Sequence, residues 1–310
     1  MATNSLRTAY GEALVELGKE NPNIVVLEAD LGKSTMSNLF QNAYPERYFE
    51  MGIAEANMAS TAAGLALTGK IPFINSFAVF STGRCYDQLR QTIAIAKLNV
   101  KICGSSAGLS DYGDGSTHQS VEDMSLMRAI PGMTVLVPVD AVETTKMVAA
   151  MVNNPGPMYI RINRNDLPIV TPTAPPFEIG KLYTIQEGKD VVVFANGVMV
   201  SRALAAAEEL KAEGVSVKVV NVSTIKPLDR QAVIECAKGM KAVVTAEEHS
   251  VIGGLGSAIA EALRLEKGVP LDFVGIEDVF GTSALNYDEL LEHYGLTAQA
   301  ITAKIKGLLK

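Results

Sequence analysis

The chain has 310 residues, of which 48% are hydrophobic and 20% are charged, so it is long and apolar enough to bury the cores of two ordinary domains. Its net charge of −7 argues against a nucleic-acid-binding protein, which needs a basic face. No apolar run reaches the ~20 residues that span a bilayer, and the N-terminus lacks the apolar core of a signal peptide.

Short β-branched runs alternate with amphipathic segments through the first half of the chain. Residues Leu6–Lys19 predict a helix, because Leu6, Tyr10 and Leu14 recur on one face together with Leu17. The elements expected after it are strand Ile24–Leu27, helix Ala54–Thr68, strand Ile71–Ile74, helix Tyr86–Ala96 and strands Val100–Cys103, Thr134–Val137 and Met158–Ile162. This alternation is typical of parallel βα units.

A proline-rich segment, Leu167–Phe177, interrupts the pattern. Four prolines in eleven residues argue against a helix or a central strand, so we interpret residues 167–180 as a linker. The pattern then resumes with strand Val191–Phe194, helix Val200–Glu213, strands Val215–Val222 and Val243–Ala246, and helix Gly256–Leu265. We therefore expect an α/β protein of two domains, residues 1–166 and 181–310, each a mostly parallel sheet flanked by helices.

The cysteines bear on location. Cys85, Cys103 and Cys236 are odd in number and far apart, which fits neither a disulfide framework nor a metal-binding spacing. A reducing cytoplasm is the default location for such a chain.

Glu55 stands near the start of the small-residue helix expected for Ala54–Thr68, in the segment E-M-G-I-A-E-A-N-M. A carboxylate buried there loses solvation, which favours its protonated form, and burying it without a partner is costly. A hydrogen bond to a heteroaromatic ring nitrogen of a ligand is one good reason to keep it. The alternative is an acid that only complements the helix dipole.

Two phenylalanines, Phe77 and Phe80, come just after the strand expected for Ile71–Ile74, and the polar residues around them have a loop composition. Aromatic side chains at the carboxyl end of a parallel strand can form a platform for a flat ligand. The alternative is packing in the core, the usual fate of phenylalanine.

A long polar loop, G-S-S-A-G-L-S-D-Y-G-D-G-S-T-H-Q, follows Cys103 and carries Asp114 and His118. Long polar loops in compact domains are often functional, so we interpret His118 as a site residue, with a structural histidine as the alternative.

Three arginines at element ends are candidates for anion capture. Arg161 and Arg164 end the strand Met158–Ile162 in R-I-N-R-N-D-L-P, and Arg7 begins the first helix. Arginine suits bidentate capture of phosphate or carboxylate, and a plain surface ion pair is the alternative.

Taken in order, these segments resemble the C-terminal half of transketolase over nearly the whole chain. The most specific matches are G-I-A-E-A-N-M, D-G-S-T-H-Q and R-N-D-L-P, the last at Arg164–Pro168. The chain is also similar to the matching half of deoxyxylulose-phosphate synthase and, more distantly, to the β subunit of pyruvate dehydrogenase. The resemblance implies a pyrimidine-binding domain followed by a transketolase C-terminal domain.

The resemblance also implies thiamine diphosphate as cofactor and assigns roles. Glu55 would hydrogen-bond the aminopyrimidine nitrogen and favour the imino tautomer, which removes the thiazolium proton. Phe77 and Phe80 would stack on the pyrimidine, and Asp30 would line the same cleft. The implied substrate contacts are made to hydroxyls by Asp114 and by His118, which is also taken as catalytic, and to the sugar phosphate by Arg7, Ser34 and Arg164.

Two positions depart from the family pattern. Ser106 falls where many transketolases have a histidine near the substrate, so the donor or acceptor preference is open. Gly83 falls where many have a third aromatic residue beside the pyrimidine, so we expect that wall of the pocket to be built differently.

The resemblance covers a chain without the domain that binds the diphosphate and its metal. Gly113–Gly115 matches the G-D-G that opens the metal motif, but the next asparagines, Asn153 and Asn154, lie too far downstream, so we expect no magnesium site here. Met1 and the complete first helix favour a natural subunit. We expect Mg²⁺ ligands on a separate N-terminal partner, in a two-plus-two heterotetramer.

The leading hypothesis is the C-terminal subunit of a split transketolase, which moves a two-carbon ketol unit from a ketose phosphate to an aldose phosphate. The alternatives are half of a deoxyxylulose-phosphate synthase, a transketolase specialised for an unusual sugar phosphate, and a non-catalytic subunit that binds a partner.

Overall fold

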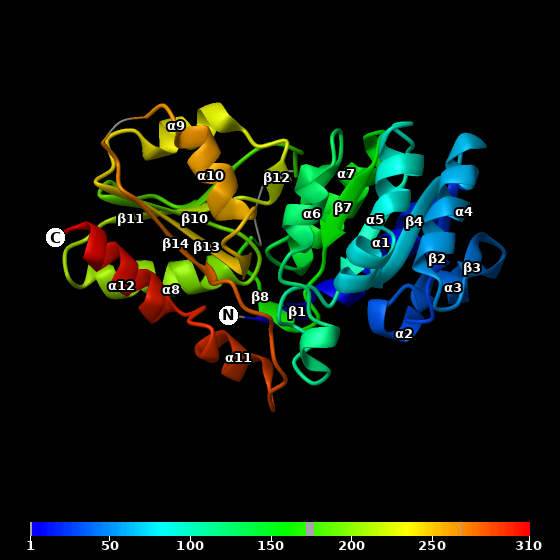
Figure 1. The fold of residues 1–310 in the computed structure, drawn as a ribbon, viewed down its shortest axis with the longest axis horizontal. Helices are drawn as coiled ribbons and strands as arrows, with labels where there is room; N and C mark the ends of the chain where they lie inside the picture. Colours follow the sequence, from blue (N-terminus) through cyan, green and yellow to red (C-terminus); the bar gives the residue numbers. More distant parts are fainter. Residues whose placement is uncertain (1, 172–176, 267) are drawn as a thin grey trace.

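The computed structural model describes residues 2–171, 177–266 and 268–310, which form two α/β domains lying side by side (Figure 1). The elements of the first domain are β1 (Thr3–Ser5), α1 (Leu6–Glu20), β2 (Ile24–Glu28), α2 (Gly32–Thr35), α3 (Asn38–Ala43), β3 (Tyr48–Glu50), α4 (Glu55–Leu67), β4 (Ile71–Phe77), α5 (Tyr86–Gln88), β5 (Lys101–Ser105), α6 (Asp123–Ala129), β6 (Thr134–Leu136), α7 (Ala141–Asn153), β7 (Met158–Arg161) and β8 (Asp166–Pro168). Two π-helical turns, Phe80–Arg84 and Leu89–Ala94, flank α5.

The rest of the chain supplies β9 (Tyr183–Gln186), β10 (Val191–Ala195), α8 (Met199–Lys211), β11 (Val217–Asn221), β12 (Thr224–Lys226), α9 (Arg230–Ala237), β13 (Ala242–Ser250), α10 (Leu255–Leu263), β14 (Leu271–Ile276), α11 (Tyr287–His293) and α12 (Ala298–Leu308). In the part of the chain that the structure describes, none of these helices is long and apolar enough to cross a membrane.

Both domains are built on mostly parallel sheets, which confirms the expected α/β class. The larger sheet has the strand order β12-β6-β7-β5-β4-β2-β3, in which only β12 is antiparallel to its neighbour. The smaller sheet has the order β14-β13-β10-β11-β9, with β9 antiparallel. Every residue of β2 (IVVLE) and β10 (VVVFA) is buried, as expected for strands covered by helices on both faces.

The central parallel strands of the larger sheet all have their carboxyl ends on the same side of the sheet, and we call this side its carboxyl edge. The register pairs Glu28 with Asn75, Phe77 with Ser105, and Gly104 with Arg161. Phe77 is the last residue of β4, and the segments that follow β2, β3, β4, β5 and β7 carry the other site residues expected from the sequence, except Arg7 at the start of α1. In an open α/β sheet this edge is where ligands bind.

The two domains are joined by more than the chain connection. Strand β12, from the second half of the sequence, pairs with β6 at the edge of the larger sheet. The Ser223 carbonyl accepts a hydrogen bond of 2.8 Å from the Val137 N–H. The buried carboxylate of Glu143, on α7, accepts hydrogen bonds from Asn221 Nδ2 at 3.0 Å and from the Ser223 hydroxyl.

A buried ion-pair cluster also crosses between the domains. Arg161 Nε donates to Asp123 Oδ2 at 2.8 Å, and its Nη2 donates to the Glu248 carbonyl at 2.9 Å. Asn163 Nδ2 donates to Glu248 Oε2 at 3.2 Å. The Arg161 side chain is only 5% exposed and its charge is paired with Asp123, so it stabilises the fold and is not available to a ligand. Arg161 thus forms an ion pair, as one of the two interpretations expected, but the expected surface location is wrong, because both partners are buried.

The expected helices and strands are confirmed to within a few residues, with two differences near the site. The expected strand Ile71–Ile74 continues as β4 to Phe77, so Phe77 is the last strand residue and does not lie beyond the strand. The expected helix Tyr86–Ala96 is α5 followed by a π-helical turn. The strands that the sequence did not reveal are short or edge strands: β1, β3, β8, β9, β12 and β14.

The expected linker, residues 167–180, is only partly loop. Leu167 and Pro168 belong to β8, which pairs antiparallel with β1 in a two-stranded sheet. Proline is tolerated there because every strand of such a sheet is an edge strand. Residues 172–176 of the expected linker lie outside the described residues, and the domain boundaries at 166 and 181 stay a prediction.

Glu28, at the end of β2, is fully buried and holds the segment that follows it. Its carboxylate accepts hydrogen bonds from the hydroxyls of Thr35 at 2.6 Å and Ser37 at 2.5 Å, and from the Ala29 N–H at 3.0 Å. Burial raises the pKa of Glu28 from 4.5 to about 7, an effect that these three hydrogen bonds reduce.

We expect Glu28→Gln to remove a pH dependence of stability. Between pH 4.5 and 7 the folded chain holds a proton on Glu28 that the unfolded chain has lost, so stability falls as pH rises through this window. The free energy of unfolding of the variant, relative to the natural chain, should rise by roughly 2–3 kcal/mol from pH 4.5 to pH 8. Urea denaturation at both pH values measures it, with the exposed Glu20→Gln as control. If the variant and the natural chain differ in unfolding free energy by the same amount at both pH values, the raised pKa of Glu28 is contradicted.

Candidate active site

Glu55 is the first residue of α4, and its side chain is 3% exposed. The Ser76 hydroxyl of β4 lies 3.4 Å from Glu55 Oε1. The Arg84 guanidinium donates from Nη1 to both carboxylate oxygens, at 3.2 and 3.4 Å. The expected burial of Glu55 is therefore confirmed, while the charged partner was not foreseen.

Aromatic rings gather beside this carboxylate. Phe77 and Phe80 stack nearly parallel, with ring centroids 6.1 Å apart and an interplanar angle of 14°. The His118 ring meets both edge-on, 5.3 Å from Phe80 and 6.2 Å from Phe77. Phe77 is 3% exposed and Phe80 is half-buried. The structure thus brings together two residues from β4 and its π-helical turn with a histidine from a loop distant in the sequence.

Arg84 is a site residue that sequence reasoning missed. Its guanidinium carbon lies 4.0 Å from the centroid of the Phe80 ring, a cation–π contact, while its Nη1 binds Glu55. Arg84 lies four residues after Phe80, and both belong to one π-helical turn. Such turns change the register of side chains and are frequent at functional sites, but the sequence carries no clear signal for them.

A second group of charges adjoins Phe77. Arg164, whose guanidinium carbon lies 5.7 Å from the Phe77 centroid, donates to Asp111 Oδ2 at 3.2 Å and approaches Ser106 Oγ at 3.5 Å. The Arg7 side chain donates to the Arg164 carbonyl at 3.0 Å and to the Ser34 carbonyl at 2.7 Å. The expected grip residues Arg7, Ser34 and Arg164 are therefore neighbours, and the resemblance had not pointed to Asp111.

The electrostatics of this group favour an anion. Burial, and then the like charge of Arg164, lower the pKa of Arg7. Burial raises the pKa of Asp111, while Arg164 opposes this rise. Holding two guanidinium groups near each other costs Coulomb energy, which the negative charges of Asp166 and Asp111 oppose. An anion placed between Arg7 and Arg164 would lower that cost.

The remaining candidates stand at the rim. Asp30 is exposed and has a positive φ of 61°, and its N–H donates to Glu50 Oε1 at 2.8 Å. Asp114 is exposed on the loop and close enough to Asp111 to raise the pKa of that group by charge repulsion. Gly83 faces open space, since a Cβ added there would meet nothing within 4 Å.

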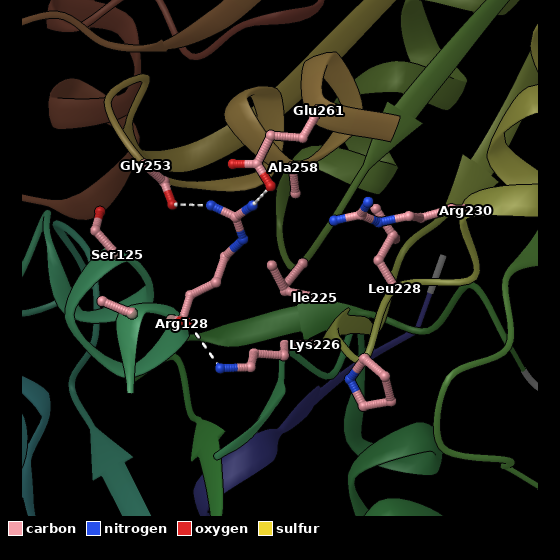
Figure 2. Close-up of a pocket in the computed structure, with 11 residues that line it drawn as sticks. Ser125, Arg128, Ile225, Lys226, Leu228, Arg230, Gly253, Ala258 and Glu261 are labelled. Carbon is pink, nitrogen blue, oxygen red and sulfur yellow. Dashed lines mark hydrogen bonds and ion pairs between the residues drawn. The ribbon is translucent and has the colours of Figure 1, made fainter. Parts of the chain in front are cut away.

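A large pocket of about 580 Å³ lies elsewhere, where the two domains meet. Figure 2 shows Arg128 in this pocket, bound to the Gly253 carbonyl at 3.0 Å and to Glu261 at 2.6 Å. Lys226 donates to the carbonyls of Arg128 and Ile130. Arg128 and Lys226 are thus partnered, and Arg230 also lines the pocket. The pocket contains none of the residues expected at the site, so it is a separate feature of the domain interface.

Comparisons with known proteins agree with this geometry. Residues 2–170 match the family model of the transketolase pyrimidine binding domain, and residues 180–301 match that of the transketolase C-terminal domain. A putative transketolase C-terminal section of Methanocaldococcus jannaschii is 44% identical over 310 residues, covering 98% of this chain and 96% of the relative. The 6-deoxy-6-sulfo-D-fructose transketolase subunit SqwH of Clostridium sp. (strain MSTE9) is 45% identical over 296 residues, covering 96% and 92%.

A solved structure agrees as well. A protein described as a split gene transketolase, inactive beta4 tetramer, matches with a TM-score of 0.90 and 48% sequence identity, covering 99% of each chain. Both family models, the relatives and this structure point the same way, and together they span both domains. This chain therefore belongs to the transketolase family and corresponds to the C-terminal half of transketolase.

Proposed function

We propose that this chain is the C-terminal subunit of a split transketolase, which transfers a two-carbon ketol unit from a ketose phosphate to an aldose phosphate. The observation that carries the proposal is the buried Glu55 carboxylate beside the stacked rings of Phe77 and Phe80. A buried acid next to an aromatic face can bind a flat heteroaromatic ring by one hydrogen bond and by stacking.

The donor set fits the aminopyrimidine half of thiamine diphosphate. The planar Arg84 guanidinium already lies on Phe80 and hydrogen-bonds Glu55, so a flat group that stacks on Phe80 and forms a hydrogen bond with Glu55 is chemically suited to this place. The open space at Gly83 leaves room beside it. When bound, thiamine diphosphate supplies a nucleophilic carbon and an electron sink for cleavage of a carbon–carbon bond.

The chain's own residues would then bind and orient the cofactor ring and the substrate, and move protons between them. Glu55 would hold a proton against the ring nitrogen, while Phe77 and Phe80 face the ring and Asp30 lines the cleft. His118, 5.3 Å from the Phe80 ring, and Asp114 would hydrogen-bond hydroxyls of the donor and acceptor substrates. At the end of the site away from Glu55, the substrate anion would be held by Arg7, Ser34 and Arg164. Ser106 would contact the substrate beside them.

We propose that a separate N-terminal subunit supplies the diphosphate and Mg²⁺ site, in a cytoplasmic two-plus-two heterotetramer. The names of the relatives support this, because they speak of a C-terminal section, a subunit and a split gene. Over residues 2–171, 177–266 and 268–310, no group of three or more His, Cys, Asp or Glu side chains is placed to hold a metal ion.

A second candidate substrate class has its own support. The subunit from Clostridium sp. (strain MSTE9) is named for 6-deoxy-6-sulfo-D-fructose, and it is 45% identical to this chain. A sulfonate and a phosphate are both tetrahedral oxyanions that two guanidinium groups can hold. Comparing kcat/KM for ketose phosphates and for sulfo-sugars distinguishes the two classes, and turnover with pyruvate would instead favour the chemistry of a deoxyxylulose-phosphate synthase.

Activity should depend on the partner. We expect the purified chain to show no ketol transfer with thiamine diphosphate and Mg²⁺, because in this proposal the partner supplies the diphosphate-binding half of the site. Adding an N-terminal transketolase subunit from the same genome should restore transfer, measured by aldose consumption in a coupled assay. Full activity of the isolated chain would refute the split-subunit proposal.

Glu55→Ala should lower kcat of the reconstituted enzyme by about 10²–10⁴-fold, the usual contribution of a group that positions or moves a proton. Steady-state kinetics on the assembled enzyme measure this loss, with the exposed Glu46→Ala as matched control. Circular dichroism should show that both variants keep their fold. Near-normal turnover of Glu55→Ala would favour the non-catalytic alternative.

A further inference from the structure

Arg84 takes up the two contacts that a bound pyrimidine ring needs. Its guanidinium lies 4.0 Å from the Phe80 centroid, which is the stacking face, and donates to Glu55, which is the hydrogen-bonding group. A ring that stacks on Phe80 and binds Glu55 cannot share that place with a second planar group. Arg84 and a bound ring are therefore mutually exclusive in this conformation.

We propose that Arg84 is a displaceable occupant of the cofactor ring site, which neutralises Glu55 in the empty chain and must swing out before the ring binds. This inference rests on the proposed function, because it takes the ring to be the aminopyrimidine of thiamine diphosphate. It adds a conformational step that the proposed function does not require.

The exposed fractions of the two side chains fit an arginine that moves away and a carboxylate that stays in place. Glu55 is 3% exposed, whereas the Arg84 side chain is 50% exposed. The arginine can thus move into solvent without disturbing the core, while the carboxylate stays in place. A buried carboxylate without a partner is costly, so the pair stabilises the empty chain.

The surroundings of Arg84 contain no other group that would hold it inward. Among the described residues, the side chain of Arg84 contacts Glu55 and Phe80. An arginine with a purely structural role would be tied to several elements, as Arg161 is to Asp123 and Glu248. Arg84 is instead tied only to the two residues that the ring would use.

Removing the occupant should tighten cofactor binding, because the apparent dissociation constant includes the fraction of chains in which Arg84 is already displaced. We expect Arg84→Ala and Arg84→Met to lower the Kd for thiamine diphosphate about 3- to 10-fold, as suits a half-exposed ion pair. Titration calorimetry on the chain mixed with its N-terminal partner and Mg²⁺ measures this Kd. Without cofactor, Tm of the variants should fall by about 2–4 °C.

Chemical rescue sharpens the test. Methylguanidinium should refill the space in Arg84→Ala, raising Tm of the cofactor-free variant and weakening thiamine diphosphate binding competitively. Arg90→Ala, an exposed arginine on the following π-helical turn, is the matched control and should change neither quantity.

The outcomes separate the two proposals. If thiamine diphosphate does not bind the unaltered chain with its partner, the proposed function fails. If it binds, and both Arg84 variants bind it equally or more weakly, the proposed function stands and the displacement proposal is overturned. Arg84→Met provides the measurement should Arg84→Ala fail to fold.

Discussion

The candidate site depends on one constraint, the placement of a carboxylate almost out of water at the start of α4. A side chain such as Glu55 is stable there only with a partner that donates hydrogen bonds or positive charge. In this structure the partner is Arg84, held over the face of Phe80. The aromatic stack, the π-helical turn and the nearby histidine all surround this pair. The electrostatics of one buried group thus organise the residues that would bind a ring.

The fold delivers these residues from distant parts of the sequence. Parallel strands β2, β4, β5 and β7 end at one edge of the larger sheet, so the loops behind them meet there. The second domain contacts this region at two places. Strand β12 pairs with β6. The Glu248 carboxylate accepts a hydrogen bond of 2.8 Å from the Leu109 N–H, near the start of the loop that carries His118. The ion pairs at the domain interface are therefore part of what keeps the site in shape.

The sequence predicted the central strands of the parallel sheets well, because buried β-branched runs such as Val191–Phe194 have few alternatives, but it missed the parallel edge strands β3 and β14. It also predicted that Glu55, Phe77, Phe80 and His118 would converge, although this step needed the family resemblance. It could not predict the role of Arg84, since the direction of that side chain depends on a π-helical turn that has no local signature. It could not predict β12, because a three-residue strand pairing with the other domain is decided by tertiary contacts rather than by propensity.

The central claim is that Glu55 is the hydrogen-bonding partner of the cofactor ring, and a crystal structure of the chain with its N-terminal partner, thiamine diphosphate and Mg²⁺ tests it most directly. The account predicts a Glu55 carboxylate oxygen about 2.6–3.2 Å from a nitrogen of the aminopyrimidine ring, with that ring on the face of Phe80 and Arg84 displaced. A complex in which Glu55 points into bulk solvent, or in which the ring binds away from Phe80, would contradict the account.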